Sequence, residues 1–117
     1  MQIIENEQLV YFDCDDTLVM WFTNCDPSEK IDINNPHYGY NMALKPHKRH
    51  IELLKDHKAR KYTVIVWSAA GYQWAEAVVK ALKLEEYVDF CQSKPLKFVD
   101  DLPAQEILGS RIYLEDR

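Results

Sequence analysis

The stretch LVYFDCDDT at residues 9–17 decides the fold of this chain. Its first four residues form an apolar run that predicts a short buried strand, and acidic residues begin where that strand ends. A second run, YTVIVW at residues 62–67, is rich in β-branched side chains and is followed by Ser68. Strands that are apolar throughout are typical of a parallel sheet covered on both faces.

Two helices are predicted around the second strand. Residues 46–60 are expected to turn Ile51, Leu53 and Leu54 inward, with Pro46 in the first turn. Residues 71–84 place apolar side chains at four-residue spacing, which indicates an amphipathic helix with one buried face. The side chains expected on that face are Trp74, Val78 and Leu82.

Three shorter strands complete the prediction, at residues 87–91, 97–99 and 111–114, and a brief turn or helix runs from Pro103 to Gly109. We therefore predict one α/β domain over residues 1–117, with a three-layer, doubly wound, mainly parallel sheet. Residues 20–44 are the irregular part, a loop or flap with room for a hairpin pairing 31–33 with 38–42. This insertion is too short for a folded cap domain.

Composition excludes several other classes of protein. The chain has 117 residues, of which 47% are hydrophobic, which is enough for a single core. No run approaches the roughly 20 apolar residues of a membrane span, and residues 1–10 lack a basic leader, so we expect a cytoplasmic protein. The three cysteines are odd in number and widely spaced, which predicts reduced thiols. Cys14 lies between acids and is a poor candidate for a nucleophile.

Polar residues follow four of the predicted strands. If the sheet is parallel, the carboxyl ends of these strands meet at one edge, where function collects in such folds. Carboxylates there can hold Mg²⁺, a lysine can neutralise a phosphoryl group, and an aspartate can attack phosphorus. A second carboxyl group can transfer the proton of the leaving group. The residues concerned are Asp13, Asp15, Thr17, Ser68, Lys94, Asp100 and Asp101.

These residues resemble the haloacid dehalogenase (HAD) superfamily. DCDDT at 13–17 is similar to its DxDxT signature, VIVWS at 64–68 to its second motif, KP at 94–95 to its third, and FVDD at 98–101 to its fourth. Ser68 follows Asp13 by 55 residues, Lys94 follows Ser68 by 26, and Asp100 follows Lys94 by six. The resemblance covers most of the chain outside residues 20–44 and implies a Rossmann-like HAD fold.

The resemblance also implies roles. Asp13 would be the nucleophile and a metal ligand, and Asp15 the general acid/base, with its main-chain carbonyl on the metal. Ser68 and Lys94 would bind phosphoryl oxygens, and Lys94 would also hold Asp13 in place. Thr17 would support the Asp15 loop, Asp100 would complete a Mg²⁺ site, and Asp101 would be a further ligand or a supporting residue. Because HAD members that cleave carbon–halogen bonds lack an acid at the position of Asp15, the resemblance favours a phosphatase that forms an aspartyl-phosphate.

One departure from the HAD pattern concerns the third motif. Family members usually place a helix between the lysine and the acidic pair, and the six positions from Lys94 to Asp100 leave no room for it. The chain therefore resembles compact, capless HAD phosphatases, with Lys97 as the fallback for Lys94. An open site suits large phosphate-ester substrates, so the leading substrate hypothesis is a nucleotide or a nucleic-acid end.

Two features bear on that substrate. Residues 45–61 hold seven Lys/Arg against two acids in a chain of net charge −5, which is either a solvated helix face or a surface for a phosphate-rich partner. Aromatic residues in the 20–44 loop and beside Ser68 either pin the loop or stack on a base. They are Trp21, Phe22, Tyr38, Tyr40, Trp67 and Tyr72.

Two alternatives remain open. A receiver-like signalling domain would need a phospho-accepting Asp at a strand end, and the candidate by position, Asp56, lies in a predicted helix. A non-catalytic HAD-like binding module would be favoured by the loss of Asp13 or Asp15, and both are present.

Overall fold

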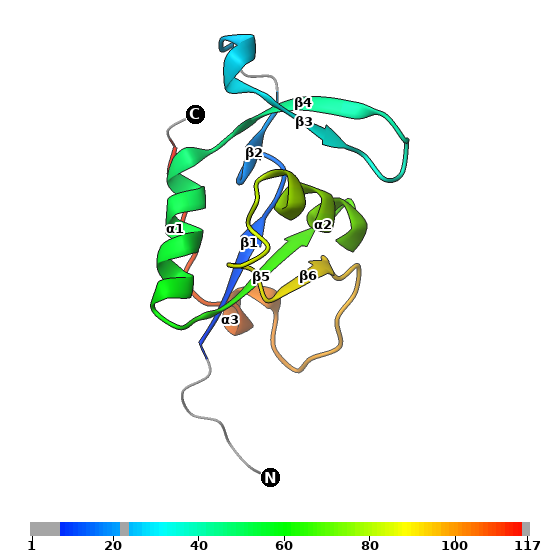
Figure 1. Cartoon of the computed structure of the whole chain (residues 1–117). Coiled ribbons are helices and arrows are strands. Elements are labelled where there is room, and N and C mark those ends of the chain that lie inside the picture. Colours follow the sequence, from blue (N-terminus) through cyan, green and yellow to red (C-terminus); the bar gives the residue numbers. More distant parts are fainter. Residues whose placement is uncertain (1–7, 22–23, 116–117) are drawn as a thin grey trace.

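A computed structural model describes residues 8–21 and 24–115 (Figure 1). The prediction for Phe22 lies outside these residues. The elements in chain order are β1 (Leu9–Asp13), β2 (Val19–Met20), the 3-10 turn η1 (Pro27–Glu29), β3 (Ile31–Asn34), β4 (Asn41–Pro46), α1 (Lys48–Ala59), β5 (Thr63–Ser68), α2 (Tyr72–Ala81), β6 (Phe90–Ser93) and α3 (Ala104–Ile107).

A parallel sheet with the order β1-β5-β6 forms the centre of the molecule. The register pairs Asp13 with Trp67 and Ser68 with Ser93, so the three strands end at a common edge. The consecutive residues Val64, Ile65 and Val66 are all buried, as expected for a strand covered on both faces. The strands predicted at 9–13 and 62–67 are confirmed, and the one predicted at 87–91 begins instead at Phe90.

Helix α1 differs in detail from its prediction. Pro46 ends β4 rather than entering the first turn, and the side chain of His47 caps the helix by accepting a hydrogen bond from the His50 amide. Leu54 is buried, as predicted, but its buried neighbours on the helix are histidines, whereas Ile51 and Leu53 are only half-buried. Sequence periodicity missed this face because histidine was counted as polar.

Helix α2 buries the expected face. Trp74 and Val78 are buried against the core, and Leu82 lies just after the helix, half-buried, as its C-cap. Gly71 precedes the helix with φ of +107°, a conformation that L side chains rarely adopt, so glycine allows the sharp turn from β5 into α2.

Apart from residues 22 and 23, which lie outside the described part of the chain, the segment 20–44 has more regular secondary structure than predicted. The expected hairpin forms, as β3 paired with β4, but its second strand covers 41–46 rather than 38–42. β2 joins β4 to make a three-stranded antiparallel sheet. The turn-forming residues are concentrated in the connection, where the Asn35 side chain accepts a hydrogen bond from the His37 amide and Gly39 has φ of +72°. Ile33 and Leu44 are buried, so the sheet packs on the body rather than forming a loose flap (Figure 1).

The strands predicted at 97–99 and 111–114 are wrong, because neither segment is extended in a sheet. Residues 94–103 form a loop, and α3 follows Pro103, as expected for a brief helix there. The backbone of Leu114 bonds the side chains of His47 and His50 instead of a neighbouring strand. A run of three or four strand-forming residues becomes a strand only where an unpaired edge of a sheet lies next to it. Tertiary contacts therefore override the β-propensity of such a short run.

These elements make a small α/β structure whose parallel three-stranded sheet and helices are compatible with a Rossmann-like HAD fold. The doubly wound, three-layer arrangement stays a prediction. No helix within residues 8–21 and 24–115 has the length and apolar character needed to cross a bilayer.

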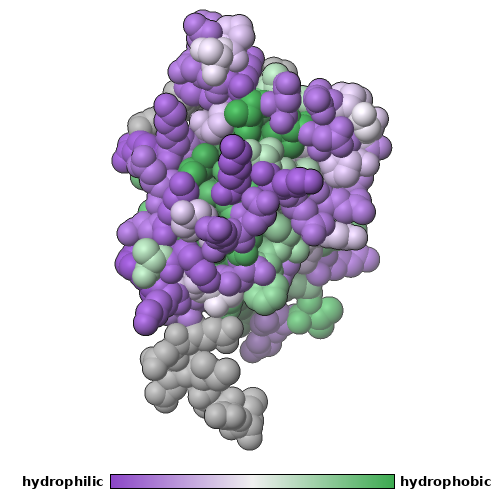
Figure 2. All heavy atoms as spheres, viewed as in Figure 1, coloured by the Kyte–Doolittle hydropathy of each residue, from purple (hydrophilic) through white to green (hydrophobic). Residues whose placement is uncertain are grey.

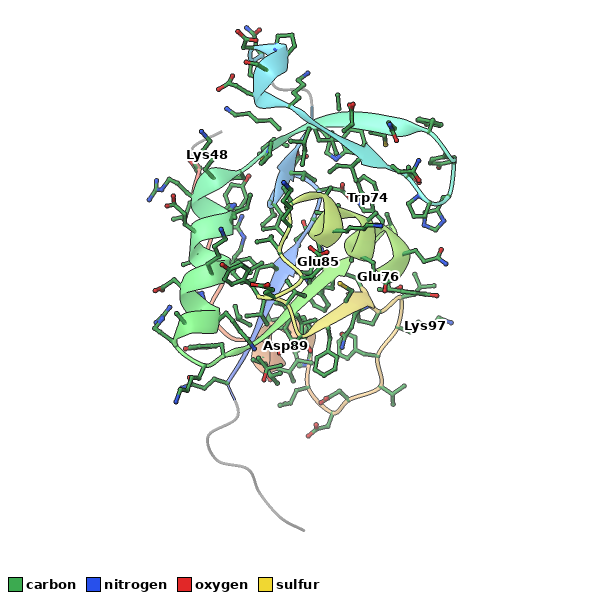
Figure 3. The ribbon with its side chains drawn as sticks, viewed as in Figure 1. Lys48, Trp74, Glu76, Glu85, Asp89 and Lys97 are labelled. Atoms are coloured by element: carbon green, nitrogen blue, oxygen red, sulfur yellow. The ribbon has the colours of Figure 1, made fainter. Side chains whose placement is uncertain are left out.

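Asp89 ties the end of α1 to the sheet (Figure 3) and provides a prediction about stability. Its carboxylate accepts hydrogen bonds from Lys58 Nζ at 2.8 and 2.9 Å and from the Val64 amide at 2.8 Å, and these bonds lower the pKa of Asp89 below its usual 3.8. The stabilisation is therefore complete above pH 3.8 and is lost as pH falls through the lowered folded-state pKa. We expect Asp89→Ala to lower the free energy of unfolding at neutral pH by about 1 kcal/mol or less, because the pair is partly exposed.

Urea melts of the wild type and Asp89→Ala at a series of pH values from neutral into the acid range measure this contribution. The difference between the free energies of unfolding of the two proteins should shrink as the pH falls. A difference that stays constant would contradict the assignment to the ionised carboxylate.

Candidate active site

Asp13 stands at the carboxyl end of β1, where its side chain is 33% exposed and therefore accessible to a substrate. Lys94 Nζ lies 3.1 Å from Oδ1, and the Thr17 hydroxyl donates to Oδ2 at 3.3 Å. An aspartate carboxylate held in this way can act as a nucleophile. Three of the predicted site residues, separated by up to 81 positions in sequence, thus meet at this edge.

The loop after Asp13 is held by its own backbone. The Cys14 carbonyl accepts hydrogen bonds from the amides of Thr17, Leu18 and Val19 at 3.2, 2.9 and 3.1 Å. Asp16 has φ of +60°, and its carboxylate accepts a hydrogen bond from the Trp21 amide at 3.1 Å. Asp16 therefore shapes this turn, and the tight turn directs the Asp15 side chain.

Asp15 is bound by two tryptophans. Its Oδ1 accepts hydrogen bonds from Trp21 Nε1 at 2.8 Å and from Trp74 Nε1 at 3.0 Å. Trp21 directly follows β2, and Trp74 comes from α2 (Figure 3). The sequence analysis missed both as site residues, because Trp21 was interpreted as a loop aromatic and Trp74 as core. The signal that could have found them is the buried indole N–H, which needs an acceptor.

Ser68 and Lys94 are connected at the ends of their strands. Ser68 is fully buried, its hydroxyl oxygen accepts a hydrogen bond from the Ala70 amide at 3.0 Å, and its carbonyl accepts one from the Lys94 amide at 2.9 Å. Lys94 Nζ also lies 5.6 Å from the centroid of the Trp67 ring, which limits where it can point. Lys97, the fallback, extends outward from the loop after β6 (Figure 3).

Asp100 and Asp101 are not brought to this edge. They belong to the loop between β6 and α3, which descends away from the carboxyl end of β1 (Figure 1). The Asp100 carboxylate accepts a hydrogen bond from the Leu102 amide at 2.9 Å, and this bond, followed by one from Asp101, lowers the pKa of Asp100. The convergence expected of Asp100 depended on the strand at 97–99, which does not form.

A divalent cation does not fit the arrangement as it stands. Within residues 8–21 and 24–115 there is no group of three or more His, Cys, Asp or Glu side chains that could hold a metal ion. Asp13 is bound by Lys94 and Thr17, and one oxygen of Asp15 is taken by two indole N–H groups. A Mg²⁺ site therefore needs an oxygen ligand from elsewhere.

The three cysteines, Cys14, Cys25 and Cys91, are not joined in disulfides. Burial, and then the charges of Asp15 and Asp13, raise the pKa of Cys14 well above its usual range, so this thiol stays protonated at neutral pH. The prediction that Cys14 is not a nucleophile is consistent with this.

The histidines of the basic stretch are structural. His47, His50 and His57 are buried. His50 Nδ1 lies 2.8 Å from the Thr17 carbonyl, and its Nε2 accepts a hydrogen bond from the Leu114 amide at 2.9 Å. His50 thereby connects the loop that carries Asp15 to the C-terminal segment, a contact that the sequence did not indicate.

The remaining cations of residues 45–61 behave mostly as a solvated face. Arg60 pairs with Asp56 along the helix at 3.0 Å, and Figure 2 shows a largely hydrophilic surface over α1. Lys48 projects outward at the start of the helix (Figure 3). Asp56 is thus an exposed helical residue rather than a strand-end acceptor, which removes the structural basis for a receiver domain.

The comparison with protein families agrees with the geometry. The family model described as NLI interacting factor-like phosphatase matches residues 8–97. The matched stretch runs from β1 through β6 and contains Asp13, Asp15, Ser68 and Lys94, but it ends before Asp100. Neither the curated proteins nor the solved structures contain a match.

Proposed function

Since this chain belongs to the NLI interacting factor-like phosphatase family, a phosphatase family of the HAD superfamily, we propose that it hydrolyses phosphate monoesters through an aspartyl-phosphate on Asp13. The observation that carries the proposal is the ion pair between Asp13 Oδ1 and Lys94 Nζ, which lie 3.1 Å apart. A second carboxylate, Asp15, follows Asp13 by two residues. A nucleophile, a cation for the phosphoryl group and an acid/base are the parts that this reaction needs.

In the first step, a carboxylate oxygen of Asp13 attacks phosphorus and the bond to the ester oxygen breaks. The leaving oxygen takes its proton from the Asp15 carboxyl group, and Lys94 offsets the charge on the phosphoryl oxygens. The Ser68 hydroxyl accepts from the Ala70 amide and keeps its own hydrogen as a donor, but it is fully buried, so it would reach a phosphoryl oxygen only after the surrounding loop opens.

In the second step, Asp15, now ionised, takes a proton from water, and that water oxygen attacks phosphorus. The bond from phosphorus to Asp13 breaks, which releases inorganic phosphate and restores both carboxyl groups to their starting states. The accessible face of Asp13, which is one-third exposed, leaves room for this water.

Mg²⁺ is part of the proposal as the cofactor. The expected ligands are Asp13, the main-chain carbonyl of Asp15, and Asp100, and the ion would supply further neutralisation of the phosphoryl charge. Asp13 ends β1 and Asp15 follows it by two residues, whereas Asp100 has to come to them from the loop after β6.

We also propose a nucleotide or a nucleic-acid end as the substrate. Tyr38 and Tyr40 are 69% and 55% exposed and stack on each other with centroids 5.6 Å apart. His37, in the same turn, has Nε2 3.1 Å from the Ala70 carbonyl, so the tip of the hairpin touches the loop after Ser68. Exposed rings on a hairpin tip that contacts the loop after Ser68 suit base stacking, whereas the alternative of pinning the loop would bury them.

Replacing both tyrosines by alanine tests the substrate class. Tyr38→Ala/Tyr40→Ala is expected to lower kcat/KM for a 5′-phosphorylated oligonucleotide about five- to hundredfold, the worth of one stacked base, and to leave that for an aryl phosphate nearly unchanged. Tyr38→Phe/Tyr40→Phe is the matched control, since it keeps the rings. Equal losses on both substrates would argue against stacking.

A substrate screen tests the activity itself. Mononucleotides, 3′- and 5′-phosphorylated DNA, sugar phosphates and aryl phosphates would be offered with and without Mg²⁺, and released phosphate measured. Turnover of at least one ester is expected; a protein that hydrolyses none of them would favour the non-catalytic binding module.

A further inference from the structure

Two indole N–H groups donate hydrogen bonds to Asp15, and neither has a role in the reaction steps proposed above. Both donate to the same carboxylate oxygen, Oδ1, at 2.8 and 3.0 Å. They come from separate elements, Trp21 after β2 and Trp74 on α2, and their ring centroids lie 6.5 Å apart. The third tryptophan, Trp67, packs instead on Tyr11 and Lys94.

Two donors on one oxygen restrict the carboxyl group strongly. They fix both its position and the rotation of its plane, because rotating the plane would break both bonds at once. Trp74 is only 2% exposed and sits in the core, so its N–H is a fixed point rather than a mobile contact. Oδ1 is therefore the anchored oxygen, and Oδ2 is the one that can exchange a proton with a substrate.

We propose that Trp21 and Trp74 are positioning residues that hold Asp15 with Oδ2 directed to the leaving oxygen of the substrate. The inference rests on the proposed function, in which Asp15 is the general acid. Placement of a catalytic group matters because a displacement of about 1 Å can cost about a hundredfold in rate. The antiparallel sheet contributes to this positioning, because Trp21 directly follows β2 and its indole N–H reaches Asp15.

A comparison of substrates with different leaving groups distinguishes a positioning role of the two tryptophans from a purely structural one. An alkoxide is a poor leaving group and depends on a proton from Asp15, whereas a nitrophenolate departs without one. The parameter kcat/KM covers the steps up to departure of the leaving group and does not include hydrolysis of the aspartyl-phosphate. A loss of acid positioning therefore lowers kcat/KM for alkyl phosphates selectively.

The experiment uses Trp21→Phe and Trp74→Phe, which remove the N–H and keep an aromatic ring. We expect kcat/KM for an alkyl phosphate to fall about tenfold or more in each variant, and that for p-nitrophenyl phosphate to change less than about threefold. In an Asp15→Asn background, the same substitutions should cause no further loss, because the group they position is gone.

Equal losses on both esters, or losses that persist in the Asp15→Asn background, would overturn the proposal. If Trp74→Phe does not fold, as judged by circular dichroism, the half-buried Trp21 carries the test alone. Different results would contradict the proposed function itself. They are a wild-type protein that turns over no phosphate ester, and an Asp15→Asn variant that turns over alkyl phosphate as fast as the wild type.

Discussion

Asp13→Asn is expected to reduce phosphate-ester turnover by about 10⁴-fold or more while the protein stays folded. The substitution keeps the size of the side chain but removes the negative charge that attacks phosphorus, and removal of a nucleophile has effects of this order in other enzymes. The fold should tolerate it, since the ion pair with Lys94 is one-third exposed at both ends and surface pairs of this kind contribute little. Steady-state phosphate release and thermal melts measure the two effects.

The chain offers a matched control three residues away. Asp16→Asn makes the same chemical change at a position with φ of +60°, which asparagine adopts readily, and an amide oxygen can still accept from the Trp21 amide. This variant should keep its turnover. Acid quenching of the wild type during turnover should trap a phosphorylated protein that Asp13→Asn does not form; labelled protein in that variant would mean that another residue is the nucleophile.

Removal of divalent cations is expected to have the second-largest effect. EDTA should lower turnover about a hundredfold or more, and Mg²⁺ should restore it, because the ion offsets charge that Lys94 alone does not balance. Asp100→Asn should raise the Mg²⁺ concentration needed for half-maximal turnover, and Asp101→Asn is the matched control with a smaller effect.

This expectation has a structural consequence that can be measured. The loop between β6 and α3, which carries Asp100, lies away from the carboxyl end of β1 (Figure 1), and within residues 8–21 and 24–115 no group of three or more His, Cys, Asp or Glu side chains could hold a metal ion. β1 also has no partner strand on its outer edge among these residues. Binding of Mg²⁺ should therefore draw residues 94–103 toward β1 and slow amide hydrogen exchange there. Full activity of Asp100→Asn, together with exchange unaffected by Mg²⁺, would mean that the acids near β1 suffice.

Local sequence patterns determined the parts of the site that lie on or beside long apolar runs. The strands at 9–13 and 63–68 were predictable because continuous β-branched and aromatic residues need burial, and a parallel pairing of these two strands is enough to place Asp13 and Ser68 at one edge. Helix α2 followed from the spacing of Trp74 and Val78. The contact of Lys94 with Asp13 agrees with its expected role beside the nucleophile.

Only the tertiary structure decided the rest. The short apolar runs at 97–99 and 111–114 have too few residues to specify a partner, so the first stays a loop and the second docks on His47 and His50. The two indole N–H groups that donate to Asp15 belong to residues 53 positions apart, Trp21 and Trp74. The bond from Trp74 forms only once α2 has packed against the turn after β1. Apolar burial is encoded by composition along the chain, whereas directional polar contacts arise only after distant segments have packed.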